Sequence, residues 1–136
     1  MKGLIFYKGG YKYQLDKEYS INTGLYPSKA IYRGFITLYA SGHLVIKYGY
    51  AWDGPSGPTI DTKSFMRGSL VHDALYQLIR DGGLPEDPCR KQADDLLRKI
   101  CIEDGMTALR AWWVYKAVRF AGKDAALRQH ETLSAP

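Results

Sequence analysis

The chain has 136 residues, a formal net charge of +5 at pH 7 and a hydrophobic fraction of 46%. This length suits one domain, and the composition is that of a globular protein rather than a disordered chain. The sequence contains no apolar run near the roughly 20 residues that a membrane-spanning helix needs. The N-terminal apolar stretch is too short for a secretory signal, so we expect a soluble protein without an export signal.

The charge is unevenly distributed along the chain. The net charge is +5 over residues 1–50, −3 over residues 51–106 and +3 over residues 107–136. The acidic centre disfavours a nucleic-acid partner. The basic flanks do not change this, because no recognised nucleic-acid-binding motif accompanies them. Those flanks suit an anionic phospholipid or membrane surface, where Trp52, Trp112 or Trp113 can lie. The opposing expectation is that at least one of Trp112 and Trp113 belongs to the core.

The first fifty residues are predicted to form strands. Nine of the eleven tyrosines lie there, among the Ile, Val and Thr residues that favour β-structure. The expected strands span residues 4–7, 11–15, 34–39 and 43–50, with Ser41-Gly42 as a hairpin turn between the last two. We therefore predict an antiparallel β-sheet or a small barrel from residues 1–50.

The rest of the chain is predicted to be a loop followed by helices. Residues 51–62 contain two glycines and two prolines between positions 54 and 58, which excludes a helix or a central strand. The expected helices span about residues 63–80, 87–103 and 107–120, with glycines between them. The fold class is thus a single α+β domain over residues 1–136: a β-rich part (1–50), a motif loop (51–62), a three-helix part (63–122) and a loose tail (123–136).

Two of the predicted helices bring a histidine and an aspartate to the same level. His72 lies beside the apolar stripe of the first helix, and Asp94 lies beside that of the second, where carboxylates are rare unless paired. The short turn between the helices predicts an antiparallel hairpin, and Gly83 in that turn is the midpoint of positions 72 and 94. His72 and Asp94 can then form the base and orienting acid of a hydrolytic site. The alternative is a buried pair that only holds two helices together.

Asp73 and the motif loop suggest a cation site. Asp73 follows His72 but points to another side of the helix. Calcium takes about 6–8 oxygen ligands from carboxylates, carbonyls and water. The loop over residues 53–58 can supply carbonyls, and Asp53 adds charge. The alternatives are a helix-surface acid for Asp73 and an Asx turn for Asp53.

The pattern His72-Asp73-x-x-Tyr76, followed by Ala93-Asp94 on a leucine-rich helix, resembles phospholipase A2, most closely the compact domain of parvovirus capsid proteins. The resemblance spans roughly residues 50–101. It implies that His72 activates a water molecule, that Asp94 orients its ring, and that Tyr76 supports the aspartate. It also implies a calcium ion, Ca2+, whose ligands come from Asp73, Asp53, Trp52, Gly54 and Ser56.

A second resemblance covers more of the chain. It rests on four patterns: Asp53-Gly54-x-Ser56-x-Pro58, His72-Asp73-x-x-Tyr76, Arg90-x-x-Ala93-Asp94 and Val118-Arg119-x-x-Gly122. These are similar to a tailed-phage and prophage family, the domain of unknown function 1353. The resemblance implies a phage or prophage origin, phage proteins as partners, and a location in the host cytoplasm or the virion. It transfers no activity.

The leading functional hypothesis is a calcium-dependent, phospholipase A2-like ester hydrolase of phage origin. The alternative is a non-enzymatic phage structural or accessory protein in which the His72–Asp94 pair is a tether. A His-Asp metal phosphohydrolase is disfavoured, because such sites need further histidines and the other two, His43 and His130, fall in a strand and the tail.

Overall fold

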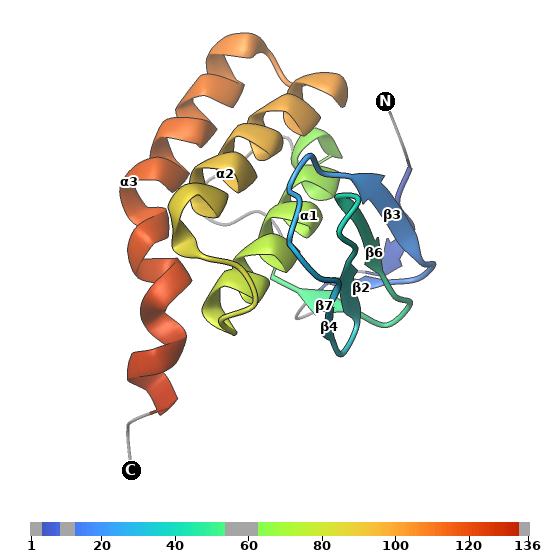
Figure 1. Ribbon diagram of the computed structural model, residues 1–136. Coiled ribbons are helices and arrows are strands. Elements are labelled where there is room, and N and C mark those ends of the chain that lie inside the picture. The colour runs from blue at the N-terminus through green and yellow to red at the C-terminus, as the bar shows by residue number, and fades with distance from the viewer. Residues whose placement is uncertain (1–3, 9–12, 54–62, 134–136) are drawn as a thin grey trace.

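The computed structural model describes residues 4–8, 13–53 and 63–133. Within these ranges the strands come first: β1 (Tyr7–Lys8), β2 (Tyr13–Leu15), β3 (Tyr19–Asn22), β4 (Ile31–Arg33), β5 (Ile36–Leu38), β6 (His43–Ile46) and β7 (Ala51–Trp52). The helices follow: α1 (Lys63–Arg80), α2 (Glu86–Glu103) and α3 (Ala108–Leu133). Figure 1 shows this order, which confirms the α+β fold.

The described strands form two antiparallel sheets rather than one closed barrel. Their orders are β1-β2-β7 and β3-β6-β5-β4. The predicted hairpin is confirmed as β5 and β6, with Gly42 at a φ of 89° in the connection, a backbone conformation that suits glycine. In this register Ile36 pairs with Ile46 and Leu38 with Leu44, and all four side chains are fully buried. The hairpin therefore contributes one complete face to the core.

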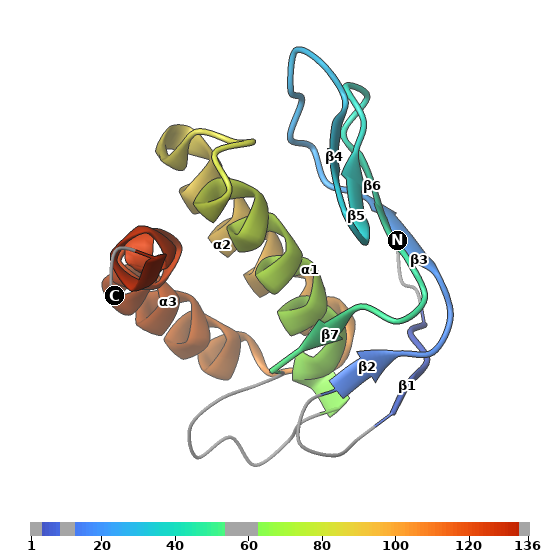
Figure 2. The same cartoon turned by 90° about the horizontal axis from the view of Figure 1, so that it is seen from below.

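The helix α1 lies at the centre of the molecule, between the strands and α3 (Figure 2). Its bounds are those that the sequence predicts, and Leu70, Leu75 and Leu78 on it are fully buried. At its end the N–H of Gly83 donates to the carbonyl of Leu78 at 2.8 Å, and the chain turns back into α2. The antiparallel α1–α2 hairpin is thus confirmed.

The helix α3 differs from its prediction in length. It continues to Leu133, although we predicted a loose tail from residue 123. The physical reason is composition: residues 123–133 are rich in Ala, Leu, Lys, Arg and Gln, which favour helix. Gly122 alone costs about 1 kcal/mol relative to Ala in a helix, too little to end one.

The buried side of α3 also differs from its prediction. Ala111 is fully buried, with Val114 and Val118 half-buried against the same small cluster. Trp112 is 39% exposed and Trp113 is 62% exposed, so the expectation that one of them is a core residue is wrong. A helix that packs against its neighbours through one narrow stripe leaves the large residues on its other sides in solvent.

Candidate active site

The candidate site lies where α1 and α2 face each other. Nε2 of His72 on α1 is 2.6 Å from Oδ1 of Asp94 on α2. The glycine turn brings the two positions to the same level, as the sequence predicts. The hydroxyl of Tyr76, one turn after His72, donates to the same Oδ1 at 2.7 Å. The three residues of the predicted catalytic group are therefore in direct contact.

Asp94 is the centre of this network, and its side chain is fully buried. Its second oxygen, Oδ2, accepts a hydrogen bond from Nη1 of Arg119 on α3 at 2.9 Å. Nη1 of Arg90, one turn before Asp94 on α2, lies 3.6 Å from the same oxygen. A carboxylate is stable at full burial only when such partners replace its water. Asp94 thus connects all three helices.

The same partners set the ionisation of Asp94. Burial raises the pKa of the carboxyl group, but the hydrogen bonds from His72 and Tyr76 and the contact with Arg119 outweigh burial and hold the pKa below its ordinary value. The pKa of Tyr76 is raised, first by burial and then by the hydrogen bond to Asp94, so its hydroxyl stays protonated. Asp94 is therefore an ionised acceptor at neutral pH.

The ionised state of Asp94 determines which nitrogen of His72 holds the proton. A carboxylate can only accept, so Nε2 of His72 is the donor and Nδ1 of the neutral ring has the free lone pair. Within the described residues no hydrogen bond is made to Nδ1, and one tenth of the His72 side chain is exposed. The ring lies 4.1 Å from that of Tyr76, which holds it in place. His72 is thus oriented as a base.

Asp73 and Asp53 form a second, acidic region beside His72. Burial raises the pKa of Asp73 to about 6; His72 and Arg80 oppose this effect, and the negative charge of Asp53 adds to it. The two carboxylates are therefore close enough to repel each other. The described residues contain no group of three or more His, Cys, Asp or Glu side chains that could hold a metal ion. A cation here would have these two carboxylates as its acidic ligands.

The start of the motif loop is anchored by Trp52. Its indole is 2% exposed, and its Nε1 donates to Oγ of Ser69 on α1 at 3.0 Å. The ring also stacks on Tyr50 at a centroid distance of 6.5 Å. The prediction that Trp52 can lie at a membrane surface is therefore wrong, because its ring is a core group. Gly54 and Ser56, the other loop residues proposed for the metal, lie outside the described residues.

Arg90 and Arg119 were not predicted to be site residues, although both occur in the patterns of the second resemblance. The signal that could have found Arg90 is its spacing of four residues before a buried aspartate on one helix. Arg119 carries no such local signal, because its contact with Asp94 depends on how α3 returns along α2.

The chain matches the model of one protein family over most of its length. Residues 31–118 match the model described as "Protein of unknown function (DUF1353)", and the match covers well over half of the chain. The chain therefore belongs to this family. The matched range includes His72, Tyr76, Arg90 and Asp94 and ends one residue before Arg119. No curated protein and no solved structure matched the chain.

No helix within the described ranges has an apolar stretch long enough to cross a membrane.

Proposed function

We propose that the chain is a phospholipase A2-like ester hydrolase in which His72 is the general base and Asp94 orients it. The observation that carries this proposal is the 2.6 Å contact between Nε2 of His72 and the fully buried Asp94. It leaves Nδ1 of His72 with a lone pair, and about one tenth of the His72 side chain is exposed. An oriented imidazole of this kind is the base of many hydrolytic sites.

In the proposed reaction, Nδ1 of His72 takes a proton from a water molecule as the water oxygen attacks the ester carbonyl carbon. The protonated ring then gives this proton to the leaving alkoxide oxygen as its bond to carbon breaks. The products are a carboxylic acid and an alcohol, and neutral His72 is regenerated. Between the two steps the ionised Asp94 stabilises the imidazolium, and Tyr76 and Arg119 hold Asp94 in position.

Calcium is the cofactor that we propose for this reaction. Asp73 and Asp53 would hold the ion together with oxygen atoms of Trp52, Gly54 and Ser56, a donor set of the hard type that calcium prefers. Burial, and then the negative charge of Asp53, raise the pKa of Asp73, and a bound cation would offset both effects. When bound, the ion would supply positive charge to polarise the ester carbonyl and offset the charge on its oxygen.

The substrate that we propose is a phospholipid at an anionic surface. Trp112 and Trp113 are exposed on α3, and Nζ of Lys116 lies 5.7 Å from the ring centroid of Trp112. Exposed tryptophans beside cations are typical of membrane–water interfaces. The resemblance to tailed-phage proteins supports a phage or prophage origin, a location in the host cytoplasm or the virion, and phage proteins as partners.

One observation favours a second candidate function. Asp94 contacts side chains from all three helices: His72 and Tyr76 on α1, Arg90 on α2 and Arg119 on α3. A phage structural or accessory protein would need this network only as a tether. In that case the same contacts would contribute to stability and to no reaction.

The experiment that tests the hydrolase is fatty-acid release from phospholipid mixed micelles, with calcium or with a chelator. We expect release by the wild type in calcium and a loss of about 10²–10⁴-fold in His72→Gln, the usual contribution of a general base. His43→Gln is the matched control, because His43 is exposed on β6 and is not among the side chains that contact Asp94. The control should retain wild-type activity.

Two variants, one at a proposed ligand and one at a control position, test whether calcium is required. Asp73→Asn should lose the response to calcium, whereas Asp95→Asn should keep it, because Asp95 is an exposed acid that pairs with Lys91 at 3.0 Å. Release that is indifferent to the chelator and to both His72→Gln and Asp73→Asn would overturn the hydrolase. No release by a folded wild type, together with a loss of stability in His72→Gln, would support the tether.

A further inference from the structure

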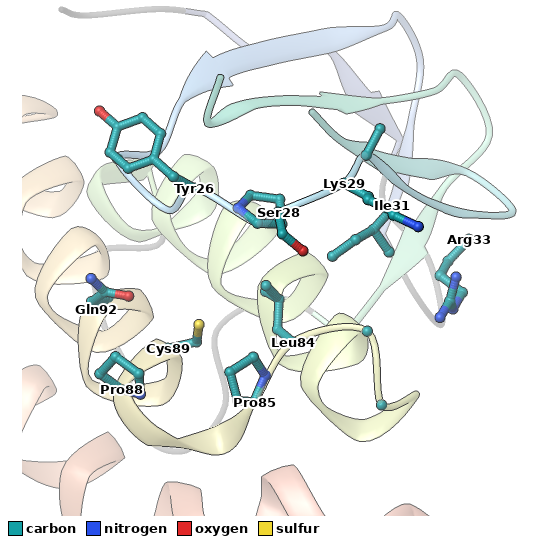
Figure 3. Close-up of a pocket in the computed structure, with 15 residues that line it drawn as sticks. Tyr26, Ser28, Lys29, Ile31, Arg33, Leu84, Pro85, Pro88, Cys89 and Gln92 are labelled. Carbon is teal, nitrogen blue, oxygen red and sulfur yellow. The ribbon is translucent and has the colours of Figure 1, made fainter. Parts of the chain in front are cut away.

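A pocket of about 690 Å³ lies at the C-terminal end of α1 (Figure 3). Three segments line it: residues 24–33, which lead from β3 into β4, the α1–α2 turn, and the beginning of α2. Gly82 in its wall follows His72 by ten residues, which places the turn about 15 Å along the helix from the imidazole. The proposed hydrolase makes no use of this pocket.

The charged side chains that line the pocket are Lys29 and Arg33, and none of the described residues in its wall is acidic. This is notable because the segment that includes α1 and α2 has a net charge of −3. Three acids, Asp81, Glu86 and Asp87, flank these wall residues in the sequence, but none of them lines the pocket, and Oε2 of Glu86 lies 3.7 Å from Nε of Arg90. The local charge of the pocket is therefore positive.

Arg33 reaches across the pocket to the α1–α2 turn. Its Nη2 lies 3.5 Å from the position that a Cβ would occupy at Gly83, so the guanidinium group lies against the turn. Lys29 and Arg33 are at the same end of the pocket in Figure 3, and Tyr26 and Gln92 are at the opposite end. Two cations that converge at one end favour a group with more than one negative charge.

The beginning of α2 forms part of the pocket wall. Asp87 has an extended conformation (φ −106°, ψ 122°), so the regular helix begins at Pro88, and both Pro88 and Cys89 line the pocket. Leu84 and Pro85 complete an apolar wall between the two ends. The pocket thus combines apolar surface with positive charge.

We propose that this pocket binds an organic phosphate. The phosphate group lies between Lys29 and Arg33, and the body of the molecule extends along Leu84 and Pro85 towards Tyr26. The volume of about 690 Å³ falls within the range of small-molecule sites, about 300–1,000 Å³, and is larger than inorganic phosphate requires. The phosphate group is shared by lipid headgroups and nucleotides, and the experiment separates these two sources.

The experiment is isothermal titration calorimetry of the full chain with glycerol 3-phosphate, adenosine monophosphate and inorganic phosphate. We expect at least one organic phosphate to bind at least tenfold more tightly than inorganic phosphate. Preference for glycerol 3-phosphate would identify a headgroup site, and preference for adenosine monophosphate would identify a nucleotide site. Either result supports the proposal.

Charge-removing variants test the assignment of the pocket. Lys29→Gln and Arg33→Gln should each weaken binding by about 10–100-fold, the effect of losing one charged hydrogen bond. Lys47→Gln removes the same charge from an exposed position outside the pocket wall and should bind like the wild type. Lys29 and Arg33 are exposed, so their variants should unfold at the wild-type temperature.

Three outcomes would overturn the proposal: no binding of any probe, equal affinity for organic and inorganic phosphate, or wild-type affinity in both Lys29→Gln and Arg33→Gln. The His72→Gln variant keeps this test separate from the hydrolase, because it should bind the phosphate probes like the wild type. The organic-phosphate site can therefore stand if the hydrolase proposal fails.

Discussion

At the scale of single residues, the structure depends most on Asp94. A fully buried carboxylate costs several kcal/mol unless hydrogen bonds and opposite charges replace its hydration. Both oxygens of Asp94 have such partners, and the resulting low pKa keeps the carboxylate ionised. The same arrangement gives His72 its tautomer, so the stability of the helices and the orientation of the candidate base have one physical cause.

Tyr76→Phe tests the contribution of this network to stability. The substitution keeps the ring that packs on His72 and removes only the hydroxyl that donates to Asp94 at 2.7 Å. We expect a loss of about 1.5–3 kcal/mol in the free energy of unfolding at pH 7, as for other hydrogen bonds to charged groups. Urea unfolding at several pH values measures it.

The pH dependence of this loss follows from the direction of the Asp94 shift. A carboxyl whose pKa is lowered in the folded state contributes stability that is complete above its unfolded pKa of about 3.9 and disappears as the pH falls through the folded value. The difference between Tyr76→Phe and wild type should therefore shrink below about pH 4. Tyr50→Phe is the control, since its hydroxyl bonds the neutral amide of Gln77 at 3.3 Å. A Tyr76→Phe loss that is independent of pH would contradict this account.

At the scale of elements, α1 and α2 were predictable and the buried side of α3 was not. Apolar periodicity and a glycine turn are local signals, and they also place His72 opposite Asp94 by symmetry about Gly83. Apolar residues cover much of the circumference of α3, so periodicity cannot say which side meets a neighbour. The contact of Arg119 with Asp94 depends on which side of α3 packs against α2, and for this reason it could not be predicted from the sequence.

The close packing of α1 on α2 depends on Gly68. A Cβ at this position would lie 2.9 Å from Cδ1 of Leu97 and 3.1 Å from Sγ of Cys101, both on α2 and both buried. In Gly68→Ala the overpacking cost of about 1–3 kcal/mol opposes a gain of about 1 kcal/mol in helix propensity. We expect a net loss of up to about 2 kcal/mol in the free energy of unfolding, measured by urea unfolding.

A double-mutant cycle with Leu97→Ala isolates the contact at Gly68. The single substitution Leu97→Ala should cost about 2–5 kcal/mol, as other truncations in cores do. The new methyl group at position 68 can then occupy part of the space, so the double variant should lose about 0.5–3 kcal/mol less than the sum of the single variants. Additive losses would show that the two helices separate instead of meeting at this contact.

At the scale of the whole molecule, the strands and the helices share one core. Buried residues of β5 and β6 such as Ile36 and Ile46 belong to the same hydrophobic cluster as Leu70 and Leu75 of α1. The order of strands before helices could be read from composition, because tyrosine and β-branched residues are concentrated in the first fifty positions. The division into two sheets depends on long-range pairing, such as β2 with β7, which no local pattern encodes.

Arg67 of α1 is one of the polar links between these parts. Its side chain is 3% exposed; Nη1 donates to the hydroxyl of Tyr19 on β3 at 2.9 Å, and other guanidinium nitrogens pair with Glu103 at 2.8 Å and Asp104 at 3.0 Å. Arg67→Met keeps the length of the side chain but leaves the two acids and Tyr19 without this partner. We expect a loss of about 3–5 kcal/mol in the free energy of unfolding, as for other broken buried ion pairs.

The hydrogen exchange of β3 distinguishes a link from a local contact. If Arg67 connects the strands to the helices, the amides of β3 should exchange faster in Arg67→Met by a larger factor than those of β5, which lies inside its sheet. Lys91→Met removes an exposed partner of Asp95 and should change neither stability nor exchange measurably. Wild-type stability in Arg67→Met, or equal acceleration of exchange in β3 and β5, would show that the apolar core alone holds the two parts together.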